Sequence, residues 1–123
     1  MDDQPKSADR KDAHIALALE PLAIAAVDAG FDAIRLDHCA APECDLEAIS
    51  LGAEFLGYQL SAPLIIGAMT GGTARATSIN HALAEVAETA GISLAVGSQR
   101  ASLEASQSQA DLRTLAPSIP LIG

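Results

Sequence analysis

Three short sequences carry side chains that could bind an anionic ligand. Residues 69–72 read Met-Thr-Gly-Gly, residues 98–100 read Ser-Gln-Arg, and residues 10–14 read Arg-Lys-Asp-Ala-His. Paired glycines let a ligand approach the backbone and its N–H groups, and a thioether packs well on an aromatic ring. A guanidinium can bind phosphate through two hydrogen bonds. Together the three sequences could hold a ligand with an anionic group and a flat ring.

Each of the three also has a plainer interpretation, which the residues alone leave open. The glycine pair is typical of a tight turn between a strand and a helix, with Thr73 capping the helix. Arg100 has Glu104 four residues on and could pair with it on a helix surface. The basic residues near the N-terminus could form a solvated arm.

Composition argues against several classes of function. The chain has 123 residues and a net charge of −9, which argues against a nucleic-acid surface. No apolar run reaches the ~18–20 residues of a membrane span, and the start is too polar for a secretory signal, so we expect a cytoplasmic protein. Cys39 and Cys44 are expected to be free thiols, since a zinc site with His38 lacks a fourth ligand.

The second half of the chain alternates between strand and helix patterns. Apolar runs at 63–67 and 92–97 are typical of strands buried on both faces, and a third begins at Ile119. Residues 74–90 and 103–116 have helical spacing. Their apolar stripes are Ile79, Leu83, Val86 and Ala90 in the first, ended by Gly91, and Leu112 and Leu115 in the second. The strands start about 28 and 27 residues apart, which is typical of parallel strands joined by crossover helices.

This spacing predicts an α/β fold, the N-terminal portion of a (β/α)8 TIM barrel. Eight units of this length would occupy about 220 residues, close to the size of a complete barrel. Residues 61–123 would form the first two βα units and the third strand of an incomplete barrel. A small doubly wound sheet is the alternative, but two units and a strand cannot cover both of its faces.

Residues 1–60 are predicted to form an N-terminal extension. An Ala- and Leu-rich stretch from Ile15 to Ala29 looks helical, and Gly30 would end it. Two short β-prone pieces around Phe55 and Tyr58, separated by Gly57, predict a β-hairpin.

The sheet would bring the chemistry-bearing sequences together. Parallel strands end at the same edge of a sheet, and ligands bind there in α/β folds. The turns at 68–72 and 97–100 are therefore expected to lie side by side, with the basic N-terminal segment over them. If Thr70 and Arg100 pointed to opposite ends of the sheet, this prediction would fail.

The three sequences, in this order and spacing, closely resemble a known family. Residues 10–14, 54–72 and 96–100 are similar to type 2 isopentenyl-diphosphate Δ-isomerase, the FMN-dependent form, and the likeness runs from Arg10 to the last residue. The resemblance implies an enzyme of isoprenoid biosynthesis that interconverts isopentenyl and dimethylallyl diphosphate. Reduced FMN would take part in moving the proton, Mg²⁺ would sit on the diphosphate, and NADPH would keep the flavin reduced. It also implies a homo-oligomer at full length.

The resemblance implies a role for individual residues. The flavin-contacting residues would be Ala68, Met69, Thr70 and Ser98. The residues that hold the substrate diphosphate would be Arg10, Lys11 and Arg100. His14 and Gln99 match the family's motifs without a defined role.

The chain stops at Gly123, where the family's sequence continues. The catalytic glutamine, the Mg²⁺-binding glutamate and the FMN phosphate site would follow later, so no catalytic or metal-ligating residue is expected here. The 123 residues are therefore expected to be a truncated and inactive fragment. Two alternatives stay open: a non-catalytic α/β fragment that binds an anion at most, and the N-terminal part of another FMN-dependent barrel oxidoreductase.

Overall fold

The computed structural model describes residues 7–97 and 110–123. Its main sheet contains β3 (Ile65–Ile66), β4 (Ser93–Ala95) and β5 (Leu121–Ile122), in the order β3-β4-β5. Both pairs are parallel, with Ile66 opposite Leu94 and Leu94 opposite Leu121. Neighbours in the sheet are thus neighbours along the chain, as the spacing of the apolar runs predicts.

The connection from β3 to β4 is the helix α2 (Ala74–Ala90), whose predicted bounds are confirmed. Thr73 caps its N-terminus, because its side-chain oxygen accepts a hydrogen bond from the N–H of Ala76 at 3.1 Å. Gly91 ends it in the left-handed conformation, with φ at 65°, and its N–H donates to the carbonyl groups of Ala87 and Glu88. A Cβ at Gly91 would also meet the side chain of Ser61, which would have to move.

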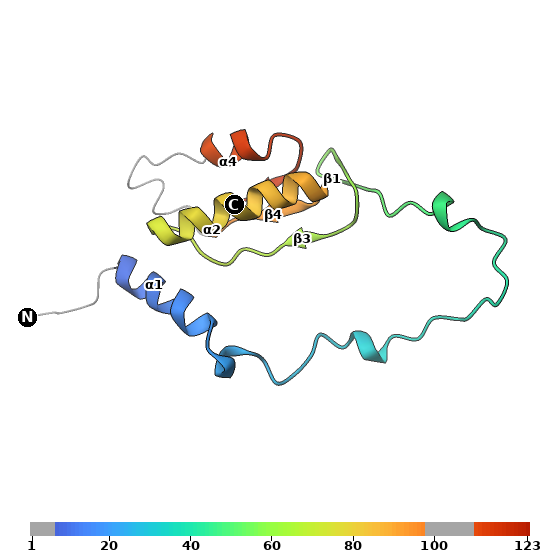
Figure 1. Ribbon diagram of the computed structural model, residues 1–123, viewed down its shortest axis with the longest axis horizontal. Helices are drawn as coiled ribbons and strands as arrows, with labels where there is room; N and C mark the ends of the chain where they lie inside the picture. The colour runs from blue at the N-terminus through green and yellow to red at the C-terminus, as the bar shows by residue number, and fades with distance from the viewer. Residues whose placement is uncertain (1–6, 98–109) are drawn as a thin grey trace, which may run out of the picture.

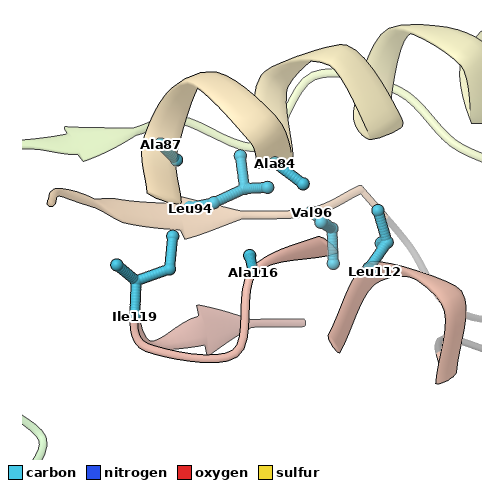
Figure 2. Close-up of a cluster of buried hydrophobic side chains, with 7 residues drawn as sticks. All are labelled: Ala84, Ala87, Leu94, Val96, Leu112, Ala116 and Ile119. Atoms are coloured by element: carbon cyan, nitrogen blue, oxygen red, sulfur yellow. The ribbon is translucent and has the colours of Figure 1, made fainter. Parts of the chain in front are cut away.

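The hydrophobic core lies between the sheet and two helices (Figure 2). It consists of Ala84, Ala87, Leu94, Val96, Leu112, Ala116 and Ile119. The helix α4 (Ala110–Leu115) supplies Leu112, which is buried as predicted, and contacts α2 as well. Both helices therefore pack on the face of the sheet that carries Leu94.

The apolar stripe predicted for α2 is wrong in part. Val86 is 57% exposed and Ala90 is exposed, whereas Ala76, Ala84 and Ala87 are fully buried. Alanine has no side chain beyond Cβ, so this face of the helix can approach β4 closely, and the larger Val86 is left outside. Ile79 and Leu83 are half-buried beside that face.

The first strand is not buried on both faces, which corrects a second expectation. Ile65 is 49% exposed and Leu64 is 58% exposed. Both connecting helices pack on the opposite face, around Leu94, so the described residues leave the side of the sheet that carries Ile65 partly open.

The N-terminal segment also differs from its prediction. The helix α1 spans Ser7–Ala18, so the helix expected over Ile15–Ala29 is wrong. Pro21 stands three residues after its end and begins a short 3₁₀ turn, and Glu20 before it is extended, as residues preceding proline usually are. Gly30, at a φ of 80°, begins another such turn, η2 (Phe31–Ala33), rather than ending a helix.

Residues 19–52 run as an exposed loop away from the sheet (Figure 1). Besides η1 (Pro21–Ala23) and η2, the loop contains η3 (Leu46–Ala48). Cys39 and Cys44 lie in it as exposed free thiols. Within the described residues, no helix is long and apolar enough to cross a membrane.

The predicted hairpin is confirmed. The strands β1 (Ala53–Phe55) and β2 (Tyr58–Leu60) pair antiparallel, with Phe55 opposite Tyr58. The turn residues Leu56 and Gly57 both have positive φ, at 51° and 80°, as a tight type I′ turn requires. The next residue after the hairpin, Ser61, donates its N–H to the carbonyl of Gly91 at 2.8 Å and so ties the hairpin to the end of α2.

Candidate ligand-binding site

A pocket of about 480 Å³ lies where α1 meets the turns that follow β3 and β4. Figure 1 shows α1 beside the N-terminal end of α2 and the turn that leads into it. From α1 and the residue after it, the lining residues are Lys11, His14, Ile15, Ala18 and Leu19. From the sheet and α2, they are Met69, Thr70, Gly71, Ile79 and Gly97. The volume lies in the range of pockets that bind small molecules and cofactors.

One face of α1 forms the wall of this pocket. Lys11, His14, Ile15 and Ala18 are spaced by three, four and seven residues from the first, so they project from the same side of the helix. Lys11 and Ile15 are half-buried there. Of the basic residues, Lys11 is therefore packed against the pocket, His14 lines it while exposed, and Arg10 is exposed outside it.

The turns after β3 and β4 lie against each other. A Cβ at Gly97 would clash with the backbone of Thr70, so the two turns approach at van der Waals contact only because residue 97 is glycine. Asn80 of α2 donates its side-chain N–H to the carbonyl of Thr70 at 3.1 Å, which ties this turn to α2. The described part of the two turns thus occupies one edge of the sheet, where the sequence predicts it.

The residues predicted to contact a flavin are placed as follows. Met69, which is 71% exposed, and Thr70, which is half-buried, line the pocket. Ala68 is exposed next to them and does not line it. Ser98 lies outside the described residues.

Of the residues predicted to hold a diphosphate, one lines the pocket, one lies outside it, and one is not among the described residues. Lys11 lines the pocket, whereas Arg10 is exposed on α1 and does not. Arg100 and its neighbour Gln99 lie outside the described residues, and the placement of Arg100 beside Thr70 stays a prediction. His14, for which the sequence predicts no role, lines the pocket.

Sequence reasoning missed the apolar part of the wall, which consists of Ile15, Ala18, Leu19 and Ile79. The spacing of Ile15 and Ala18 from Lys11 carries the missing signal, because these positions share one helix face. The sequence predicts the N-terminal helix over Ile15–Ala29, so Lys11 and His14 fall outside the predicted helix and their shared face with Ile15 is not recognised. Gly97 lies in the turn at 97–100 that the sequence places at this edge, but its contact with the backbone of Thr70 is not predicted, because that contact depends on the tertiary fold.

The lining of the pocket combines positive charge with apolar surface. Lys11 and His14 provide nitrogen donors, while no Asp or Glu is among the described lining residues, although the whole chain carries a charge of −9. Ile15, Leu19 and Ile79 supply apolar side chains. This arrangement suits a ligand that has an anionic group at one end and an apolar body at the other. Within the described residues there is no group of three or more His, Cys, Asp or Glu that could hold a metal ion.

Comparison with known proteins gives one consistent name. No family model matches the chain. A protein of Xanthobacter autotrophicus named isopentenyl-diphosphate delta-isomerase is 51% identical over 123 residues, 97% of this chain and 36% of its own length. Proteins of the same name from Stutzerimonas stutzeri and Chlorobaculum parvum are 49% and 44% identical, over 92% and 94% of this chain. The chain spans about a third of the length of these relatives.

The comparisons correct the resemblance drawn from the sequence. The relatives carry the name isopentenyl-diphosphate delta-isomerase without a type and without a cofactor, and no family model matches. The identification as an N-terminal fragment of the type 2, FMN-dependent form is therefore wrong as a statement of family. Nearly the whole chain aligns with about one third of the length of each of these relatives named isopentenyl-diphosphate delta-isomerase. The similarity supports that broader name alone.

Proposed function

We propose that this chain supplies part of an isopentenyl-diphosphate delta-isomerase and that the pocket between α1 and the turns after β3 and β4 belongs to its substrate site. The relatives' names support the reaction, the interconversion of isopentenyl and dimethylallyl diphosphate. The observation that carries the proposal is the lining of the pocket, which joins Lys11 and His14 to an apolar wall.

The substrate has the same two parts as the pocket. Its diphosphate carries two to three negative charges, and a protein of net charge −9 can attract it only through local cations. Lys11 would bind the diphosphate as a point charge, and His14 would donate a hydrogen bond to it. The five-carbon chain would lie along Ile15, Leu19 and Ile79, which exclude water from it.

The reaction moves a double bond by one position. One proton is added at the terminal carbon and another leaves the methylene group, so nothing else is gained or lost. Such a transfer on an unactivated alkene needs a dry pocket and an acid and base held close to the reacting carbons. Apart from Lys11 and His14, no ionisable side chain is among the described lining residues.

Reduced FMN is part of the proposal as the cofactor that would supply this acid–base chemistry. Its flat ring would lie against Met69, Thr70 and the backbone of Gly71, a surface that has no charged side chain and lets a ring approach closely. Mg²⁺ on the diphosphate and NADPH as the source of electrons for the flavin stay predictions, as does a homo-oligomer.

The proposed architecture is a (β/α)8 barrel, in which residues 61–123 form the first two βα units and the third strand. Two observations support it. The strand order follows the chain order, and α2 and α4 pack on one face and contact each other. A doubly wound sheet would place helices on both faces. The open side around Ile65 would then face the interior of the barrel.

A chimeric protein tests the proposed function. The part of the Xanthobacter autotrophicus relative that aligns with this chain would be replaced by the 123 residues, and the purified chimera would be assayed with isopentenyl diphosphate, FMN, NADPH and Mg²⁺. We expect dimethylallyl diphosphate as the product and a bound flavin absorbance. The 123-residue chain assayed alone is expected to give no turnover. A folded chimera that leaves the substrate unchanged would contradict the proposal.

A further inference from the structure

We propose that Asp12 is a positioning residue: it anchors α1 to the N-terminus of α2 and thereby holds Lys11 and His14 in the pocket. The inference rests on the proposed function only for its effect on substrate binding. The anchoring itself is a property of the fold and is tested separately below.

The anchor is a hydrogen bond between residues 61 positions apart in the sequence. The hydroxyl of Thr73 donates to Oδ1 of Asp12 at 2.9 Å. The same hydroxyl oxygen accepts from the N–H of Ala76 at 3.1 Å, the bond that caps α2. A hydroxyl has one donor and two acceptor positions, so the two bonds are compatible. The side chain of Thr73 therefore caps α2 and also forms the hydrogen bond that links α1 to α2.

Electrostatics favour the same contact. The first turn of α2 contains no acidic residue of its own. The exposed N–H groups at a helix N-terminus carry a partial positive charge, which a nearby carboxylate stabilises. Asp12 supplies that carboxylate from a different helix, which gives the anchor an attraction beyond the single hydrogen bond.

The position of Asp12 on α1 explains how the anchor orients the pocket wall. Successive residues of a helix point about 100° apart, so Asp12 can reach α2 while Lys11 and His14, on either side of it along the chain, face the pocket. Little else holds the helix from its C-terminal side, because residues 16–52 are exposed throughout. A helix of 12 residues is marginal in water on its own, so α1 depends on its contacts with the rest of the molecule.

Hydrogen–deuterium exchange of the 123-residue chain tests the anchor directly. Asp12→Ala removes the acceptor, and Thr73→Asp keeps a good helix cap but places a second carboxylate against Asp12. Because this hydrogen bond is exposed, both are expected to speed exchange in residues 7–18 by about 3- to 5-fold. Exchange in residues 74–90 should stay unchanged in Thr73→Asp. Unchanged exchange in residues 7–18 of both variants would overturn the proposal.

Three matched variants separate the anchor from general damage. Thr73→Ser keeps the hydroxyl and should keep the protection of residues 7–18. Ala16→Gln changes an exposed side chain of the same helix, outside its first turn, to another good helix former, and should change exchange less than twofold. The double variant Asp12→Asn with Thr73→Asp restores a donor and an acceptor with their roles reversed, so it should recover protection lost in Thr73→Asp. No recovery would count against the hydrogen bond as the cause.

The effect on substrate is read in the chimera. Asp12→Ala should raise KM for isopentenyl diphosphate by about 10-fold with a smaller change in kcat, because the group that binds is displaced while the reacting atoms are not touched. If exchange in residues 7–18 rises but KM does not, the positioning role is wrong. If the chimera is inactive while exchange responds as expected, the proposed function fails and the anchor stands.

Discussion

Lys11 and His14 bring their nitrogen donors to a pocket whose other described lining side chains are uncharged, in a chain that is strongly acidic. Their neighbour Arg10, for which the resemblance implies the same role as for Lys11, is exposed outside the pocket. Composition indicates only that local cations must attract an anion. Which of two adjacent cations faces the pocket depends on the rotation of α1, and that is set by the packing of Ile15 and by the anchor at Asp12.

Gly97 gives a prediction at the same scale. A Cβ there would clash with the backbone of Thr70, which cannot yield as a flexible side chain would. Gly97→Ala should therefore lower the free energy of unfolding of the chain by about 1–3 kcal/mol, the usual cost of overpacking, measured by urea titration. Gly67→Ala is the matched control, because nothing lies within 4 Å of a Cβ at that position. Equal stability of both variants would argue against the close contact of the two turns.

At the scale of the elements, local signals predict α2 well and α1 badly. The sequence of α2 has both a capping residue, Thr73, and a terminating glycine, Gly91, so the bounds of this helix follow from the sequence. The N-terminal stretch from Ile15 to Ala29 has helical composition but contains Pro21, which outweighs composition, and α1 begins eight residues earlier among charged side chains. Helical composition followed by a glycine is therefore a poor guide when a proline interrupts the stretch.

The buried face of α2 leads to a second prediction. Ala84 is fully buried against β4 and α4, whereas Ala82, two residues before it, is exposed. Ala84→Leu should cost about 1–3 kcal/mol of unfolding free energy, because three extra carbon atoms must enter a packed core. Ala82→Leu makes the same chemical change on the exposed face and should stay within about 0.5 kcal/mol of the parent. A larger effect at Ala82 than at Ala84 would show that the helix faces the sheet differently.

At the scale of the whole molecule, strand order follows from the repeat length of the apolar runs, but burial does not. The sequence predicts β3 as a strand buried on both faces, but Leu64 is 58% and Ile65 49% exposed, because α2 and α4 pack on the other face. An apolar run predicts a strand, but it does not show which face of that strand other elements cover, because this depends on the tertiary fold.

The open face predicts how the 123-residue chain behaves in solution. Besides Leu64 and Ile65, large apolar side chains along the loop are exposed, such as Leu22 at 98% and Leu36 at 88%. Apolar patches of this kind and unpaired strand edges favour association. We expect light scattering after size-exclusion chromatography to show a mass that rises with concentration. A monomer at every concentration, with a sharp thermal transition, would contradict this.

We propose that the pocket between α1 and the turns after β3 and β4 binds the substrate diphosphate, and substitution of Lys11 tests this most directly. Lys11→Met in the chimera keeps much of the apolar stem and removes the charge. Arg35→Ala removes a cation from the exposed loop, where its guanidinium donates to the backbone carbonyls of Asp32 and Ile34. We predict that Lys11→Met raises KM for isopentenyl diphosphate by about 10- to 100-fold, the loss of a hydrogen bond to a charged group, and that Arg35→Ala leaves it unchanged. Equal KM values for the two variants would contradict the account.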